Sequence, residues 1–274
     1  MTKCGGSDAT MSVMHPDNWG WRARIGMFIV GVEAVPEAEW WAMLPSGVSV
    51  HASRISAPTP WASWTSDGSC LQLSDDLERG AKQFAAMPLS VVVVGHTSSS
   101  VKGGRGWDDA VVGQLSDRVA RDTLVTTNGL DCRAALHAMK VRRPFLVFPA
   151  WFDSQVQAKG IEYFSDHGFQ PSTYMRFDPG RNWRDLPPGE LYRHGMGFAQ
   201  DVEALYVQVR SGCPSEADSV LILGTGFRCV SILEALEQDL QRPVIAANQA
   251  SLWHSLRLAG VNEQVAGYGS LLSL

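Results

Sequence analysis

The chain has 274 residues, 45% of them hydrophobic, and a net charge of −5 at pH 7. A chain of this length and apolar content can bury two domain cores, which excludes a largely disordered protein. Lysines and arginines are scattered, so no basic stripe could neutralise a nucleic-acid backbone, and no apolar run approaches the roughly 18 residues that span a bilayer. Because the start of the chain also shows no signal-like apolar stretch, we expect a cytoplasmic protein that binds neither nucleic acid nor membranes.

Short apolar runs alternate with segments whose apolar residues recur every three or four positions, as in parallel strands separated by helices. The predicted strands are Ile25–Val30, Leu89–Val94, Thr123–Thr127, Pro144–Phe148, Ser219–Leu223 and Pro243–Ala247. The predicted helices are Glu37–Leu44, Leu77–Met87, Leu130–Met139, Ser154–His167, Glu190–Arg210, Ser231–Leu240 and Ala250–Ala259. We therefore predict an α/β fold with doubly wound parallel sheets, and mobile segments over the first 24 residues and Pro58–Ser69.

An internal repeat relates the two parts of the chain. The segment Thr123–Val141 aligns without a gap on Pro243–Val261, at an offset of about 120 residues, and Asn128 falls on Asn248. Three shorter pairs follow in the same order: RIGMFIV with RPFLVFP, HASRI with TYMRF, and VVVVGHT with SVLILGT. Four ordered matches indicate a duplication.

The duplication predicts two similar halves related by a pseudo-twofold axis, with the active site in the cleft between them. We place a flexible tail at residues 1–23, the first half at residues 24–122 plus 242–274, and the second half at residues 123–241. The sequence does not settle the oligomeric state, and a homo-oligomer is compatible with it.

Several kinds of site are disfavoured by the spacing of the residues that they need. The five cysteines are widely separated without a CxxC pair, which indicates reduced thiols, and no two of the seven histidines have metal-ligand spacing. The segment Gly224–Gly226 lacks the third glycine of a dinucleotide-binding loop, and neither a phosphate-binding P-loop nor a GxSxG nucleophile motif occurs. We expect no metal and no cofactor.

Two polar loops directly follow predicted strands, where ligands of open parallel sheets bind. The first contains His96, Thr97 and Ser98, and the second is Gly224-Thr225-Gly226 at the matching place of the other half. Hydroxyls and free backbone N–H groups at such turns can hold a carboxylate or phosphate from both sides of a cleft. The alternative is a pair of polar helix N-caps without a ligand.

The segments around these loops resemble the aspartate/glutamate racemase superfamily, in its maleate isomerase and arylmalonate decarboxylase branch. The resemblance covers about residues 22–274 and rests on the stretch beginning RARIGMFIVGVEAVPEAEWW, on VVVVGHTSSSVKGG, on SVLILGTGFRCV with the helix after it, and on the closing GYGSLL. It implies duplicated halves, an active site between them and catalysis without a cofactor. In the racemases one cysteine from each half acts on a carbon beside a carboxylate; the decarboxylase keeps only the second.

The sequence departs from that pattern at both thiols. His96 occupies the position of the first cysteine and Gly224 that of the second, while Cys229 lies five residues, more than one helical turn, further on and is predicted to be a buried helix residue. Glu33 replaces the asparagine that follows the family's first strand, and Trp151 replaces a tyrosine in the second half. Two-thiol racemisation is therefore not expected.

Acid–base chemistry can replace the thiols. An unperturbed histidine titrates near pH 6.5, so His96 can transfer a proton, and Glu33 can orient it or act as base. Substrate binding is predicted for the remaining site residues, which are Thr97, Ser98, Trp151, Gly224, Thr225 and Gly226. The favoured function is a cofactor-independent lyase or isomerase of a small carboxylic acid, by decarboxylation, proton transfer or cis-trans isomerisation. The alternatives are a hydrolase or deaminase of the ectoine-utilisation type and an inactive protein that only binds a small acid.

Overall fold

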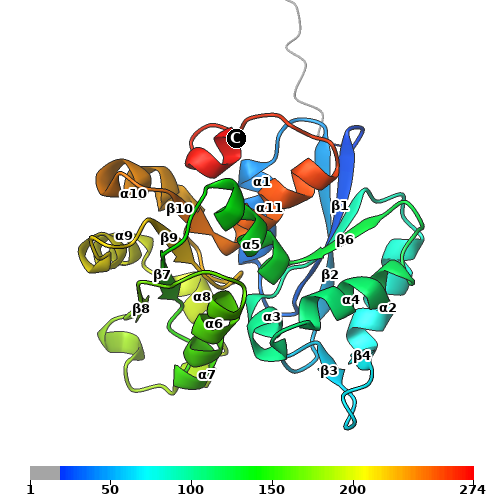
Figure 1. The fold of residues 1–274 in the computed structure, drawn as a ribbon, viewed down its shortest axis with the longest axis horizontal. Helices are drawn as coiled ribbons and strands as arrows, with labels where there is room; N and C mark the ends of the chain where they lie inside the picture. The colour runs from blue at the N-terminus through cyan, green and yellow to red at the C-terminus, as the bar shows by residue number, and fades with distance from the viewer. Residues whose placement is uncertain (1–18) are drawn as a thin grey trace, which may run out of the picture.

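Two four-stranded parallel sheets with helices packed against them form the protein (Figure 1). The structure, a computed structural model, describes residues 19–274, so most of the tail expected at residues 1–23 lies outside the described residues. The first sheet has the order β2 (Val48–Ile55), β1 (Ala23–Val30), β5 (Val91–Val94) and β6 (Leu124–Thr127). The second has the order β8 (Thr173–Arg176), β7 (Pro144–Phe148), β9 (Ser219–Ile222) and β10 (Val244–Ala246). The predicted α/β class with parallel sheets is confirmed.

The two sheets repeat one strand order, as the internal sequence repeat predicts. Strand β1 pairs with β2 and β5, and β7 pairs in the same way with β8 and β9. The last strand of each sheet, β6 or β10, leads directly into a helix, α5 (Asn128–Ala138) or α11 (Ala247–Leu258). These two helices pack against each other between the sheets and bring the halves together (Figure 1).

The other helices connect the strands. They are α1 (Val35–Met43), α2 (Asp75–Ala85), α3 (Thr97–Gly103), α4 (Trp107–Ser116), α6 (Ser154–Asp166), α7 (Pro188–Leu191), α8 (Met196–Ala199), α9 (Val202–Gly212) and α10 (Leu233–Leu240), with short 3₁₀ turns at Arg181–Trp183, Val230–Ile232 and Ser270–Ser273. None of the helices in residues 19–274 is long and apolar enough to cross a membrane.

Local sequence explains where several elements begin. The side chains of Ser74, Asp153 and Asp201 cap α2, α6 and α9 by accepting a backbone N–H two or three residues into the helix. Strand β5 consists of four valines, all fully buried, because parallel strands covered on both faces need β-branched apolar residues in every position. The sequence therefore predicts the central strands well, and to within a few residues the helices α2, α5, α6 and α11.

Some elements were not predicted. Strands β2 and β8 carry polar residues that face solvent, and the stretch expected to be mobile contains β3 (Ala62–Trp64), which pairs antiparallel with β4 (Leu71–Leu73). This hairpin lies against α4, since the buried indole Nε1 of Trp107 donates to the Ala62 carbonyl at 2.8 Å.

The single helix predicted over Glu190–Arg210 is wrong. The segment forms α7, α8 and α9 instead, because the backbone of Gly195 is left-handed at φ 85° and Gln200 is extended. Glycine adopts a left-handed conformation without steric cost, and it interrupts the helix at that point. The residues around α7 therefore lie beside the loops that follow β7 and β9 of the second sheet.

The division of the chain into halves remains a prediction. Strand β6 follows the boundary expected at residue 122, yet it hydrogen-bonds to β5 and lies in the first sheet. Strand β10 follows the boundary expected at residue 241, yet it pairs with β9 in the second sheet. Each expected half thus contributes the strand before its interface helix, β6 or β10, to the sheet of the other half.

Candidate active site

One cavity of about 460 Å³ lies where the carboxyl ends of the strands of both sheets meet. Its walls come from the loops after β1, β2, β5, β7 and β9, together with the α7 segment. All eight predicted site residues line this cavity: Glu33, His96, Thr97, Ser98, Trp151, Gly224, Thr225 and Gly226. The structure therefore brings residues from both halves together, while their chemical roles remain a prediction.

His96 is buried at the start of α3, with its ring stacked on the indole of Trp61 at a centroid distance of 4.2 Å. Its Nδ1 lies 2.8 Å from the Ser99 hydroxyl, which also accepts the backbone N–H of Trp61. The Ser99 hydroxyl keeps one proton and one lone pair, and no other acceptor for that proton lies within hydrogen-bond distance among the described residues. A neutral ring that accepts this proton at Nδ1 carries its own proton on Nε2 and can donate it to a further group.

Burial lowers the pKa of His96 to about 3, and the positive charge of Lys102 acts in the same direction. The pKa of this imidazole is therefore shifted away from the unperturbed value near 6.5 from which its expected role was argued, because the ring is removed from water without an acidic partner. Near pH 7 the side chain can donate or accept a hydrogen bond, but the cationic form is scarce. This environment disfavours a charged imidazole near pH 7.

Glu33 is the group that titrates near neutral pH. Burial raises its pKa to about 8, against the smaller opposing effects of a hydrogen bond from Thr225 and the charge of Arg54. Arg54 does not pair with this carboxyl: its guanidinium donates to the Glu33 backbone carbonyl and to the Glu37 carboxylate. Glu33 consequently has an accessible acid form and an accessible base form.

Gly226 allows the Glu33 carboxyl to approach the second loop. A Cβ atom at residue 226 would lie 2.5 Å from Oε1 of Glu33 and 3.0 Å from Cε2 of Tyr192, closer than carbon atoms can pack. The Thr225 hydroxyl is 3.5 Å from Oε2 of Glu33, a long contact that a ligand can replace. A side chain at residue 226 would therefore displace the buried Glu33 carboxyl.

Thr97 and Gly224 are already bonded to protein groups. The Thr97 hydroxyl donates to Oδ1 of Asn128 at 2.6 Å and accepts the Gly224 N–H at 3.2 Å. The Thr97 hydroxyl and the Gly224 N–H cannot bind a carboxylate without breaking their mutual hydrogen bond, which differs from the substrate-binding role expected for them. The hydrogen bond instead joins the loop after β5 to the loop after β9, which we call the two ligand loops.

Backbone N–H groups supply the anion-binding capacity of the cavity. Within residues 19–274, the N–H groups of Thr97, Ser98, Thr225 and Gly226 and the Ser98 hydroxyl have no hydrogen-bond partner. Unpaired main-chain N–H groups favour negatively charged ligands. The two loops therefore present donors from both halves to a carboxylate.

An aromatic wall closes another side of the cavity. The Trp151 ring meets the rings of Tyr192 and Phe227 edge to face, at centroid distances of 5.0 and 5.6 Å. Tyr192 and Arg193 come from the segment expected to be one helix, so no sequence pattern indicated that they line the cavity. Ile55 and Ala57 also line it, and the alignment of HASRI with TYMRF was the signal that could have placed them at a strand end.

The described cysteines lie away from this cavity. Cys70, Cys132, Cys213 and Cys229 are free thiols, and none of them contributes to its walls. Cys229 is buried as predicted, but it precedes a 3₁₀ turn rather than lying in an α-helix, and it lines a separate cavity beside α1. Among residues 19–274, no cluster of three potential metal-ligating side chains is present.

This two-sheet fold is shared with maleate isomerase and arylmalonate decarboxylase. The maleate cis-trans isomerase of Nocardia farcinica, solved with a covalently bound succinylcysteine intermediate, has a TM-score of 0.74 at 20% identity, over 92% of this chain and 98% of that chain. The maleate isomerase of Pseudomonas putida S16 has a TM-score of 0.74 at 18% identity, over 92% and 98% of the two chains. Arylmalonate decarboxylase has a TM-score of 0.68 at 19% identity, over 91% and 98%.

In sequence, the family model described as arylmalonate decarboxylase matches residues 193–272. That range contains the loop at residues 224–226 and helix α11. A search of curated proteins finds no match.

Proposed function

We propose that the chain is a member of the arylmalonate decarboxylase and maleate isomerase branch, and that it is a cofactor-independent lyase or isomerase of a small carboxylic acid. The observation that carries this proposal is the Glu33 carboxyl, buried in a cavity between the two halves and close to unpaired N–H groups of the second ligand loop. A titratable group beside an anion-binding loop is what proton transfer next to a carboxylate requires.

Each group has a role that follows from its environment. The N–H groups of the two loops and the Ser98 hydroxyl hold the substrate carboxylate and the negative charge that develops on it. Glu33, whose pKa is about 8, removes or returns the proton at the adjacent carbon. His96 donates a hydrogen bond from Nε2 as a neutral imidazole, so the proton-transfer role expected for it passes to Glu33.

Cysteine chemistry is not part of the proposal. The isomerase of Nocardia farcinica forms a succinylcysteine adduct. By the resemblance to this family, His96 and Gly224 stand at the positions of its two thiols, and no cysteine of residues 19–274 lines the cavity. Decarboxylation or proton transfer by Glu33 is therefore favoured over addition of a thiolate to a double bond.

Isotope incorporation tests the proposal directly. The protein is incubated with maleate, phenylmalonate and simple monocarboxylates in deuterated water, and proton spectra are followed. We expect loss of a carboxyl group, or deuterium at the carbon beside the carboxylate, in the wild type and neither in Glu33→Gln. Thermal stabilisation by these acids without either change would make the protein a binding protein instead.

A further inference from the structure

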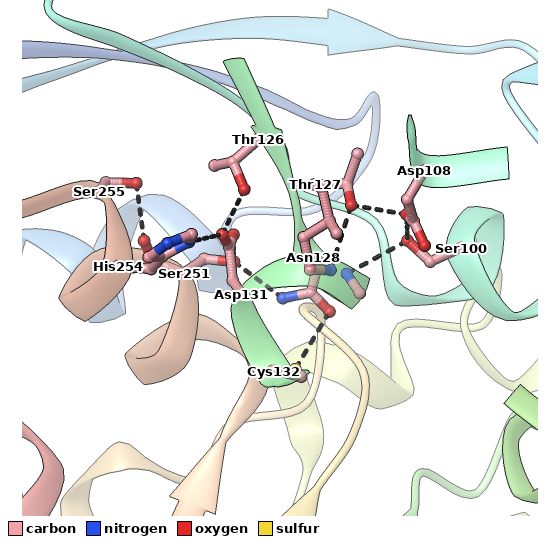
Figure 2. Close-up of polar contacts among 12 residues, drawn as sticks. Ser100, Asp108, Thr126, Thr127, Asn128, Asp131, Cys132, Ser251, His254 and Ser255 are labelled. Atoms are coloured by element: carbon pink, nitrogen blue, oxygen red, sulfur yellow. Dashed lines mark hydrogen bonds and ion pairs between the residues drawn. The ribbon is translucent and has the colours of Figure 1, made fainter. Parts of the chain in front are cut away.

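A buried chain of polar side chains runs between α5 and α11, behind the ligand loops rather than in the cavity wall. Figure 2 shows Asn128, Ser251, Asp131 and His254 in succession along it. Asn128 is completely buried and is one of the two asparagines that the internal repeat aligns. The proposed reaction makes no direct use of these groups.

The geometry fixes the orientation of the Asn128 amide. Its Nδ2 lies 2.9 Å from the Ala247 backbone carbonyl, which can only accept a hydrogen bond. Nδ2 also donates to the Ser251 hydroxyl at 2.9 Å, and that hydroxyl donates its own proton to Asp131 at 2.6 Å. The amide oxygen of Asn128 must therefore face the other way.

The fixed amide determines which way the next hydrogen bonds run. Because Oδ1 of Asn128 can only accept, the Thr97 hydroxyl must donate to it, and its lone pairs are left to accept the Gly224 N–H. Residue 97 belongs to the loop after β5 and residue 224 to the loop after β9. The row of hydrogen-bonded side chains thus ends at the contact that joins the two ligand loops.

The second repeated asparagine holds the other side of the same loop. Nδ2 of Asn248 donates to the Thr225 carbonyl at 2.8 Å and to Oε2 of Glu39 at 2.6 Å. The other carboxyl oxygen of Glu39 accepts the N–H groups of Cys229 and Val230. The loop after β9 is consequently fixed from both sides by buried asparagines.

We propose that Asn128 is a positioning residue, which is anchored through Ser251 by Asp131 and holds Thr97 and the Gly224 N–H so that the two ligand loops keep one separation. This inference rests on the proposed function in so far as the loops bind a carboxylate. Asn128 touches no ligand, and its effect on binding passes through the contact between Thr97 and Gly224.

Two serines on α11 give a matched test. Ser251 and Ser255 are both buried and lie one turn apart, but only the Ser251 hydroxyl belongs to the chain; the Ser255 hydroxyl donates to the Ser251 carbonyl. The variants are Asn128→Ala, Ser251→Ala and the control Ser255→Ala. Should Asn128→Ala fail to fold, the comparison of the two serine variants decides the question.

The first measurement is hydrogen exchange of the Gly224 amide without any ligand. We expect exchange to rise at least tenfold in Asn128→Ala and about threefold in Ser251→Ala, with no change in Ser255→Ala. The second is the dissociation constant of maleate and of phenylmalonate, determined by calorimetry. It should rise at least fivefold in Asn128→Ala, rise less in Ser251→Ala and stay within twofold in the control.

The outcomes separate this inference from the proposed function. Unchanged exchange of the Gly224 amide in folded Asn128→Ala and Ser251→Ala would overturn the positioning role, whatever the dissociation constants of the two acids. Faster exchange with unchanged affinity would overturn it too, since the loops would then bind without being held. If neither acid binds the wild type, the proposed function fails, and the exchange measurement alone decides whether Asn128 holds the loop.

Discussion

Replacing Glu33 with glutamine should change how the stability of the protein depends on pH. In the unfolded chain this carboxyl titrates near pH 4.5, whereas burial raises its pKa to about 8 in the folded protein. A raised pKa means that the stabilising effect of the protonated group is complete below pH 4.5 and is lost as the pH rises to about 8. Glutamine keeps the neutral shape and does not titrate.

The interval between the two pKa values sets the size of the effect. At 1.36 kcal/mol per pH unit, the interval corresponds to a decrease of about 5 kcal/mol in the free energy of unfolding of the wild type between pH 4.5 and 8. Glu33→Gln should therefore match the wild type near pH 4.5 and exceed it in free energy of unfolding by up to that amount at pH 9. Urea unfolding of both proteins at several pH values measures the difference. A difference that does not vary with pH would refute the burial of an uncharged carboxyl at this site.

The remaining predictions concern turnover and packing. His96→Ala should lower the rate about 100- to 1000-fold, the usual cost of losing one donor to a developing oxyanion. The wild-type rate should show no inflection near pH 6.5, because the pKa of His96 is about 3; an inflection that disappears in His96→Ala would contradict this. Cys229→Ser should keep most of the turnover, and a fatal effect would mean that a thiol performs the chemistry. Gly226→Ala should cost about 1–3 kcal/mol in thermal or urea unfolding and abolish turnover, since the new methyl group overlaps the Glu33 carboxyl; wild-type activity in this variant would contradict the close approach.

The sequence was informative where a single physical requirement determines the residue type. The valines of β5 and the apolar run of β7 can only be buried strands, and the repeat around Asn128 and Asn248 revealed the duplicated architecture. Because parallel strands end at one edge of a sheet, the polar residues after β5 and β9 could be assigned to one site.

Other features depend on contacts between distant residues. Strand β2 has three buried positions followed by mixed ones, so its alternation of buried and exposed residues is incomplete. The left-handed backbone at Gly195 interrupts a segment whose apolar spacing is compatible with one helix. The opposite pKa shifts of Glu33 and His96 were not predictable, because residue types do not reveal which of two ionisable groups loses its water and its partners. Nor did the sequence indicate that the Thr97 hydroxyl donates its hydrogen bond to Asn128.

Under the proposed function, proton transfer is assigned to one half of the duplicated architecture. In the alignment of RIGMFIV with RPFLVFP, Glu33 corresponds to Phe152, which also lines the cavity but has no acidic hydrogen. The proton would then come from the first half alone, since the matching residue of the second half is a hydrocarbon ring. A reaction at a prochiral carbon would give one enantiomer, although the scaffold itself is nearly symmetric.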